Sequence, residues 1–237
     1  MTTASATLPI GPLVDARPAK RPERVTLEGR RVTLAPLDAS RHAERLHEGS
    51  NGDAARESVW TYLFDGPYRR LDEFRANIEA KARSADPLFF AVIDNASGRA
   101  VGYQTLMRID VANRVIEVGN IMYIPAIQRT AGATEAQYLF ATHVFDELGY
   151  RRYEWKCNAL NAPSRRAAER FGFTFEGIFR QHMIVKGRNR DTAWFAMLDS
   201  EWPARKAAYE RWLAPDNFDD EGRQKLKLSE FMPKGNG

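Results

Sequence analysis

Residues 114–136 read RVIEVGNIMYIPAIQRTAGATEA, and this stretch decides the fold. Its first half, Arg114 to Ile124, has the composition of a strand that Pro125 stops. A loop of small residues, Gln128 to Thr134, follows, and Glu135 to Leu148 carries apolar residues at helical spacing. A strand that leads through such a loop into a helix presents free backbone N–H groups and the positive end of the helix dipole at one point. The stretch is therefore a candidate anion site, although an ordinary strand-to-helix turn would use small residues too.

A second cluster of this kind follows further along the chain. The predicted strand Arg152 to Cys157 leads into NALNAPS at residues 158–164, and a helix then runs to Arg170, before Gly172. Amides and a hydroxyl are thereby placed at the end of a strand and the start of a helix. Together, the two clusters favour a binding site more strongly than the first loop does by itself.

The remaining pattern extends the strands and helices on both sides of these clusters. Further strands are predicted at Arg31 to Leu37, Leu88 to Asp94, Ala100 to Asp110, Phe173 to Met183 and Thr192 to Leu198, and further helices from Asp38 or Ser40 to His47, over Leu71 to Ala82, and over Glu201 to Leu213. Residues 51–68 are predicted to form an aromatic loop or broken helix. This order of elements predicts an α/β or α+β protein with a mixed sheet.

Composition limits the possible classes of protein. A single cysteine, Cys157, forms no intrachain disulfide and builds no zinc site alone, which favours the cytoplasm and predicts no metal. No apolar run approaches the roughly 20 residues of a membrane span, so no membrane is expected as a partner. The net charge of +4 comes from mixed signs and matches no nucleic-acid-binding pattern, so no specific nucleic acid is expected either.

Length and composition also predict the domain organisation. The 237 residues, 43% of them hydrophobic, suffice for one well-buried domain. We expect a flexible, proline-containing leader over residues 1–24 and a catalytic domain over residues 25–200. A C-terminal helix with a loosely attached polar tail is expected over residues 201–237.

With these elements in order from Gly29 to Leu198, the chain resembles the GNAT superfamily of acyl-CoA N-acyltransferases, and within it the RimJ/RimL-like branch. Relative to the superfamily pattern, the first loop has Ala131 where a glycine is usual and Gly132 displaced by one position. The matching residues are Gln128, Ala131 and Ala133 of the loop, Thr134-Glu135-Ala136 after it, and Asn161, Ser164 and Gly172-Phe173 of the second cluster.

The resemblance implies the GNAT fold, a mixed and mostly antiparallel central sheet flanked by helices, with splayed strands at the acyl-CoA site. It implies acetyl-CoA as cofactor, with the pantetheine arm between the strand that ends at Ile124 and the strand that ends at Asn158. The cofactor-binding residues that it implies are Met122, Tyr123 and Ile124 through their backbone, Gln128, Arg129, Thr130, Ala131, Gly132, Ala133 and Thr134 around the pyrophosphate, and Asn161, Ser164 and Arg165 in the second cluster. On this basis, a bulky residue at Gly132 is expected to weaken cofactor binding more than the fold.

Acetyl transfer to an amine needs a base, because free amines are protonated at neutral pH. Glu117, on the strand before the first loop, is the candidate base, and its alternative role is that of a solvent-facing strand glutamate. Ser164 is the acid that the resemblance nominates, since Ala168 stands where many family members have a tyrosine, and its alternative role is a hydroxyl of the first helical turn. Cys157 would allow a route through an acyl-cysteine, but a lone cysteine is more often a small buried hydrophobe.

The acceptor is expected to be a primary amine, either a protein N-terminus or a small molecule. Candidate substrate-binding residues are Trp60, Tyr62, Asn158 and His182, although the two aromatics could instead belong to the core. An aromatic stripe on the last helix, formed by Trp202, Tyr209 and Trp212, could be core or the interface of a homodimer. The alternative function is a catalytically silent acyl-CoA-binding or protein-interaction domain of the same fold.

Overall fold

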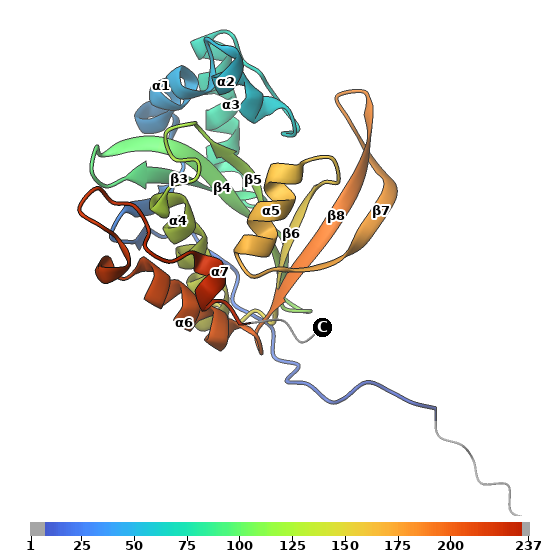
Figure 1. Cartoon of the computed structure of the whole chain (residues 1–237). Helices are drawn as coiled ribbons and strands as arrows, with labels where there is room; N and C mark the ends of the chain where they lie inside the picture. Colours follow the sequence, from blue (N-terminus) through green and yellow to red (C-terminus); the bar gives the residue numbers. More distant parts are fainter. Residues whose placement is uncertain (1–7, 234–237) are drawn as a thin grey trace, which may run out of the picture.

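An eight-stranded mixed sheet organises the part of the chain that the computed structural model describes, residues 8–233 (Figure 1). Neighbouring strands pair antiparallel except β5 and β6, which run parallel. From one edge to the other the strands are β1 (Leu27–Glu28), β2 (Val32–Pro36), β3 (Leu88–Asp94), β4 (Arg99–Asp110), β5 (Val115–Tyr123), β6 (Arg152–Asn158), β8 (Arg188–Leu198) and β7 (Thr174–Val185). The predicted mixed and mostly antiparallel sheet is confirmed.

Helices fill the connections at the predicted places. The longer ones are α1 (Ala39–Ser50), α3 (Leu71–Arg83), α4 (Ala131–Thr142), α5 (Ala162–Arg170) and α6 (Trp202–Leu213). Short turns are α2 (Ala54–Glu57), η1 (Ser58–Trp60), η2 (His143–Glu147), η3 (Pro215–Asn217) and α7 (Leu228–Phe231). Asp38 caps α1 by accepting hydrogen bonds from the backbone N–H groups of Ser40 and Arg41, so the first of the two predicted caps is the one used. In Figure 1, α1, α2 and α3 gather together, and α4 lies beside α6.

Strands β5 and β6 separate before either one ends, which opens the sheet in its middle. Their pairing runs from Val115 opposite Arg152 to Val118 opposite Trp155, while β5 continues to Tyr123 and β6 to Asn158. The register of β5 against β4 shifts in the separated part, where Asn120 has a φ of 46°. Such a bulge bends a strand, and here it accompanies the divergence of β5 from β6. The predicted splayed strands are therefore present.

The last two strands form a long hairpin that extends beyond the rest of the sheet (Figure 1). Much of β7 is exposed, whereas β8 pairs with β6 along its inner half, from Thr192 opposite Asn158 to Leu198 opposite Arg152. At the hairpin tip, the ammonium group of Lys186 donates a hydrogen bond to the backbone carbonyl of Trp60. The hairpin is thereby tied to the segment before α3.

Both ends of the chain contact the domain within the described residues. The backbone N–H groups of Ala19 and Lys20 donate to the carbonyls of Val111 and Leu148, so the second part of the predicted leader is attached to the domain. The leader's first seven residues and the last four of the predicted tail lie outside the described residues.

The sequence led us to expect a loosely attached C-terminal tail, but the structure shows this tail packed against the domain. Leu228 is fully buried, and Trp212 donates its indole N–H toward Gln224 Oε1 and the carbonyl of Leu226. The expectation failed because the polar residues of this segment surround a few apolar and amide side chains that dock on α6. Trp202, Tyr209 and Trp212 are themselves buried within the chain, so the aromatic stripe is core.

Within residues 8–233, no helix combines the length and the apolar character that crossing a bilayer requires.

Candidate active site

A cavity of about 1190 Å³ opens where β5 and β6 separate. Its walls come from both strands, from the first turns of α4 and α5, from the segment before α3, from the β7–β8 hairpin and from the C-terminal segment. We call the part around Arg129, Thr130, Arg170 and Trp212 the α4 end, and the part around Arg108, Glu117, His182 and Arg190 the hairpin end. The two clusters singled out in the sequence meet in this one space.

The α4 end has the features of an anion site. Thr130 caps α4 by accepting a hydrogen bond from the backbone N–H of Ala133, and Arg129 before it has a φ of 62°, which turns the chain sharply into the helix. Ala131 and Thr134 line the cavity from the first helical turn. Arg170 of α5 donates to the hydroxyl of Thr134 at 3.0 Å, which adds positive charge beside the helix N-terminus. Backbone dipole and guanidinium therefore favour an anion at the same place.

Gly132 lies against the core rather than on the cavity wall. It does not line the cavity, and a Cβ built on it would lie 3.0 Å from side-chain atoms of Val32 and of Ile127. Its missing side chain lets α4 pack closely on β2 and on the preceding loop. Because a side chain at this position would point toward the core, the geometry favours a larger effect of a bulky residue on the fold than on the cofactor, the reverse of the expectation from the sequence.

Three residues of the predicted set at the end of β5 differ in their exposure. The side chains of Met122 and Ile124 are buried in the core and do not line the cavity, whereas Tyr123 lines it. Gln128 donates its side-chain amide to the carbonyl of Tyr123 at 2.8 Å, which fixes the loop onto the strand end. Any contact of Met122 and Ile124 with a ligand would have to involve their backbone.

The first turn of α5 positions a second group of polar side chains. Asn161 caps this helix, its Oδ1 accepting from the backbone N–H of Ser164, and both residues line the cavity. Arg165, a predicted phosphate contact, does not line it, because its guanidinium lies 5.4 Å from the centre of the Phe175 ring. Arg166 and Arg170 face the cavity instead. The helical period determines which arginines of α5 lie on the face toward the cavity. The sequence alone did not show which face of α5 this is.

Glu117 lies at the hairpin end, and only 5% of its surface is exposed. Its Oε2 lies 2.9 Å from the ammonium of Lys156 and 3.0 Å from Nε of Arg108. Burial raises the pKa of Glu117, while Lys156 and Arg108 act in the opposite direction. The expected alternative, a solvent-facing glutamate, is excluded by this burial.

Ser164 and Cys157 lie next to each other on the wall between the two ends. The hydroxyl of Ser164 accepts the indole N–H of Trp155 at 3.0 Å, which leaves its own proton free for donation. Burial raises the pKa of the Cys157 thiol, although Ser164 and nearby cations lower it in part. At neutral pH Cys157 is therefore a thiol rather than a nucleophilic thiolate.

Three of the four predicted substrate residues line the cavity, namely Tyr62, Asn158 and His182. Tyr62 donates its hydroxyl to the carbonyl of Leu160, which links the segment before α3 to the loop before α5. The fourth, Trp60, is 1% exposed, donates its indole N–H to the carbonyl of Ser50 and packs edge-on to Phe74. It belongs to the core, because its ring fills the space between α1 and α3.

Sequence reasoning missed several residues of the site. Arg108 and Arg190 stand at the hairpin end, and Phe218 and Gln224 of the C-terminal segment wall the α4 end. None of them belongs to a motif. The sequence offered no signal for them, because Arg190 precedes the predicted strand Thr192 to Leu198 and the pairing of that strand was not predicted.

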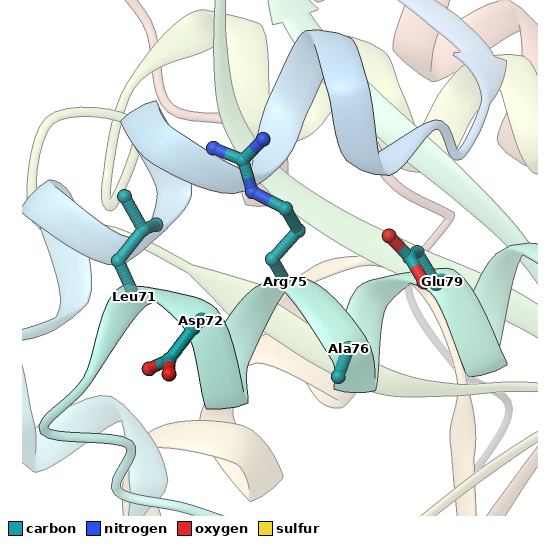
Figure 2. A pocket seen from close by; sticks show the side chains of 5 residues that line it. All are labelled: Leu71, Asp72, Arg75, Ala76 and Glu79. Atoms are coloured by element: carbon teal, nitrogen blue, oxygen red, sulfur yellow. The ribbon is translucent and has the colours of Figure 1, made fainter.

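A second hollow lies on the outer face of α3, far along the chain from both clusters. It is lined by Leu71, Asp72, Arg75, Ala76 and Glu79 (Figure 2). All five residues come from one helix and their charged side chains are exposed, so no opposing wall could desolvate a ligand. The large cavity remains the candidate site.

Fold, cavity and family comparison agree on one class: the chain belongs to the GNAT acetyltransferases, because the family model described as "Acetyltransferase (GNAT) domain" matches residues 31–174, more than half of the chain. It is similar to a GCN5-related N-acetyltransferase from Brucella melitensis, with 59% identity, a TM-score of 0.88, and coverage of 91% of this chain and 97% of that one. A crystal structure from Chromobacterium violaceum, described as GNAT family, has 40% identity and a TM-score of 0.76 over 85% of this chain and 100% of its own.

Among curated proteins, the chain is 27% identical over 175 residues to a Bacillus subtilis (strain 168) protein with the name "Putative ribosomal N-acetyltransferase YdaF". The match covers 73% of this chain and 92% of that protein. The predicted RimJ/RimL-like resemblance is confirmed, and this family uses acetyl-CoA.

Proposed function

We propose that this N-acetyltransferase binds acetyl-CoA in the β5–β6 opening and transfers the acetyl group directly to a primary amine, a protein N-terminus or a small molecule. The observation that carries the proposal is the continuity of one cavity, which runs from the N-terminus of α4 to the buried carboxylate of Glu117. A site for a long anionic cofactor and a proton acceptor are thus joined in one space.

The residues present suit acetyl-CoA. The α4 end supplies a helix N-terminus and the Arg129, Arg166 and Arg170 guanidinium groups for phosphate charge. Beyond Val118 and Trp155 the facing edges of β5 and β6 do not pair with each other, so their backbone groups are available to an amide-containing chain. When bound, acetyl-CoA supplies the acetyl group as an activated thioester.

Glu117 is proposed as the base that removes the proton from the acceptor amine, directly or through water. Burial raises the pKa of Glu117 above that of an exposed glutamate, while the Lys156 and Arg108 cations favour its ionised form. A base with its pKa moved toward the working pH is effective in general-base catalysis.

Ser164 is proposed as the group that assists departure of the thiolate. Because Trp155 occupies its acceptor position, the O–H proton of Ser164 points elsewhere, and both residues line the same wall as Cys157. Thiolates are tolerable leaving groups, so a weak donor suffices.

The test uses the purified full chain with acetyl-CoA, and measures both melting temperature and thiol release with a panel of primary amines. Acetyl-CoA should raise the melting temperature, as a ligand that binds only the folded state must, and at least one amine should give stoichiometric thiol release and an N-acetyl product. Absence of any melting shift at millimolar acetyl-CoA would contradict the proposal. A shift without transfer to any amine would favour the silent acyl-CoA-binding domain.

A further inference from the structure

Arg190 is a buried arginine at the hairpin end of the cavity, and residues 8–233 supply no carboxylate to pair with it. It is 7% exposed and lines the cavity from β8, with its guanidinium stacked 5.1 Å from the centre of the Phe64 ring. Within residues 8–233, no carboxylate lies within salt-bridge distance of it, and its buried Nε has no hydrogen-bond partner. A guanidinium cannot lose its proton to escape this cost, so an unpaired buried arginine indicates that a binding partner is missing.

The charges around Arg190 leave it without neutralisation. The carboxylate that faces this end, Glu117, is already shared between Arg108 and Lys156, and Lys156 is also held by Glu154 at 2.6 Å. Burial lowers the pKa of Arg190, and Arg108 lowers it further, while Cys157 and Glu117 oppose this. Burial first, and then Arg108, Arg190 and Lys156, lower the pKa of His182, which favours its neutral form, so this histidine does not offset the positive charge. The hairpin end is therefore net positive and can accept an anion.

The shape of the site restricts the kind of anion. A guanidinium presents its donors in a planar fork that fits a carboxylate or a phosphate in two parallel hydrogen bonds. The Cζ of Arg190 lies over the Phe64 ring, and Glu117 lines the same cavity from β5. A molecule that reaches both residues needs an anionic group for Arg190 and an amine for Glu117.

Resting on the function proposed above, we infer that the acceptor is an amine that carries an anionic group, a carboxylate or a phosphate, and that Arg190 binds this group while the amine faces Glu117. Arg190 is thus a specificity residue for the acceptor. It is not required for acetyl-CoA binding.

The experiment compares matched amines that differ only in charge. The pairs are O-phosphoethanolamine with ethanolamine, leucine with leucinamide, and the peptide amides Ala-Glu-NH₂ with Ala-Gln-NH₂. In the parent, the anionic member of at least one pair should have a kcat/KM about 10- to 100-fold higher, the value of a hydrogen bond to a charged group. The phosphate, free amino acid and peptide arms distinguish the possible sources of the anion.

Variants assign this preference to the residue. Arg190→Met should abolish it, Arg190→Lys should retain part of it because the charge remains without the fork, and Arg188→Met, an exposed arginine on the same strand, should leave it intact. The affinity for acetyl-CoA should be unchanged in all three. Arg190→Lys also serves as the folded comparison if Arg190→Met melts at a lower temperature.

Equal kcat/KM for the members of every pair in the parent would overturn the inference, and so would an unchanged preference in Arg190→Met. Loss of acetyl-CoA affinity in Arg190→Met would overturn it too, since Arg190 would then bind the cofactor.

If no panel amine is acetylated, the inference is tested by the melting temperature of the acetyl-CoA-saturated protein. Anionic amines should raise it in the parent and not in Arg190→Met, and equal shifts or none would reject the anion site. Transfer to neutral amines without any preference would leave the proposed function standing, whereas failure to bind acetyl-CoA would remove that function.

Discussion

Glu117 is a buried carboxylate that forms ion pairs with Arg108 and Lys156. The substitution Glu117→Gln tests its proposed role as the catalytic base. Glu117→Gln keeps size and shape but removes basicity, so turnover should fall by about 10²- to 10⁴-fold while acetyl-CoA still binds. In the parent, the raised pKa of Glu117 means that the rate falls as pH decreases through a value above that of an ordinary glutamate, because the carboxylate then takes up a proton. This acidic limb should be missing from the pH–rate profile of the variant.

The matched control is Glu176→Gln. Glu176 belongs to the same chain of ion pairs through Arg152 but lies outside the cavity, so its variant should keep the parent's turnover and profile. If Glu117→Gln also keeps the parent's profile, the carboxylate has only a structural role.

Cys157 allows the direct route to be distinguished from a covalent one. Its raised pKa leaves little thiolate at neutral pH, so we expect Cys157→Ala to retain turnover per folded molecule, with no acetylated enzyme in the mass spectrum of the parent after acetyl-CoA is added. Loss of turnover in a variant that melts like the parent, together with a trapped acetyl-enzyme, would establish the acyl-cysteine route instead.

Residues on recognisable motifs could be predicted, and residues outside them could not. Ser164 and Asn161 lie where the strand-to-helix pattern placed them, because a cap and a helix start are local features. Trp60 and Arg190 could not be assigned, since core and cavity both accept aromatic and long side chains and only tertiary packing separates them. The pairing of β8 with β6 brings Arg190 beside Cys157, and that pairing has no local signature.

Among the elements, α4 makes the sharpest prediction about packing. A side chain at Gly132 would press on Val32 and Ile127, so Gly132→Val should lower the free energy of unfolding by about 1–3 kcal/mol. Acetyl-CoA affinity per folded molecule should change less than stability does. Thermal melting and calorimetric titration give the two quantities.

Gly11→Val is the control for that substitution, because a Cβ on Gly11 has no neighbour within 4 Å. It should melt like the parent. A Gly132→Val variant that is as stable as the parent but binds acetyl-CoA more weakly would instead support a role of Gly132 in the anion site.

The sequence predicted which segments form strands and helices better than it predicted how these elements pair and pack in the fold. A continuous apolar run predicts strand β3, and apolar residues at helical spacing after a loop of small residues predict helix α4. The separation of β5 from β6 was expected only through the family resemblance. The register shift that accompanies it, with a positive φ at Asn120, has no specific residue signal because asparagine occurs in many settings.

At the scale of the whole molecule, the C-terminal segment joins the site from far along the chain. Phe218 packs on the guanidinium of Arg31, which also approaches Glu135 of α4. Trp212 packs on the guanidinium of Arg170, which donates a hydrogen bond to Thr134 of α4. The red segment in Figure 1 accordingly passes beside α4. Phe218→Ala should therefore weaken acetyl-CoA binding by an amount on the order of 1 kcal/mol, roughly fivefold in affinity.

Leu226→Ala is the matched control, because the side chain of Leu226 is exposed on the same segment and does not line the cavity. Its acetyl-CoA affinity, measured by calorimetry, should equal that of the parent. Equal affinity in the Phe218 variant as well would mean that the segment walls the cavity without touching the cofactor.

The family match ends at residue 174, while His182, Arg190 and Phe218 all follow it. The groups proposed for proton removal and thiolate departure, Glu117 and Ser164, lie inside the matched region. On the proposals above, the groups assigned to the transfer chemistry thus lie in the matched stretch, whereas Arg190, the residue assigned to acceptor choice, lies beyond it. If these assignments hold, relatives that differ at the position of Arg190 should accept different amines while they retain the same transfer chemistry.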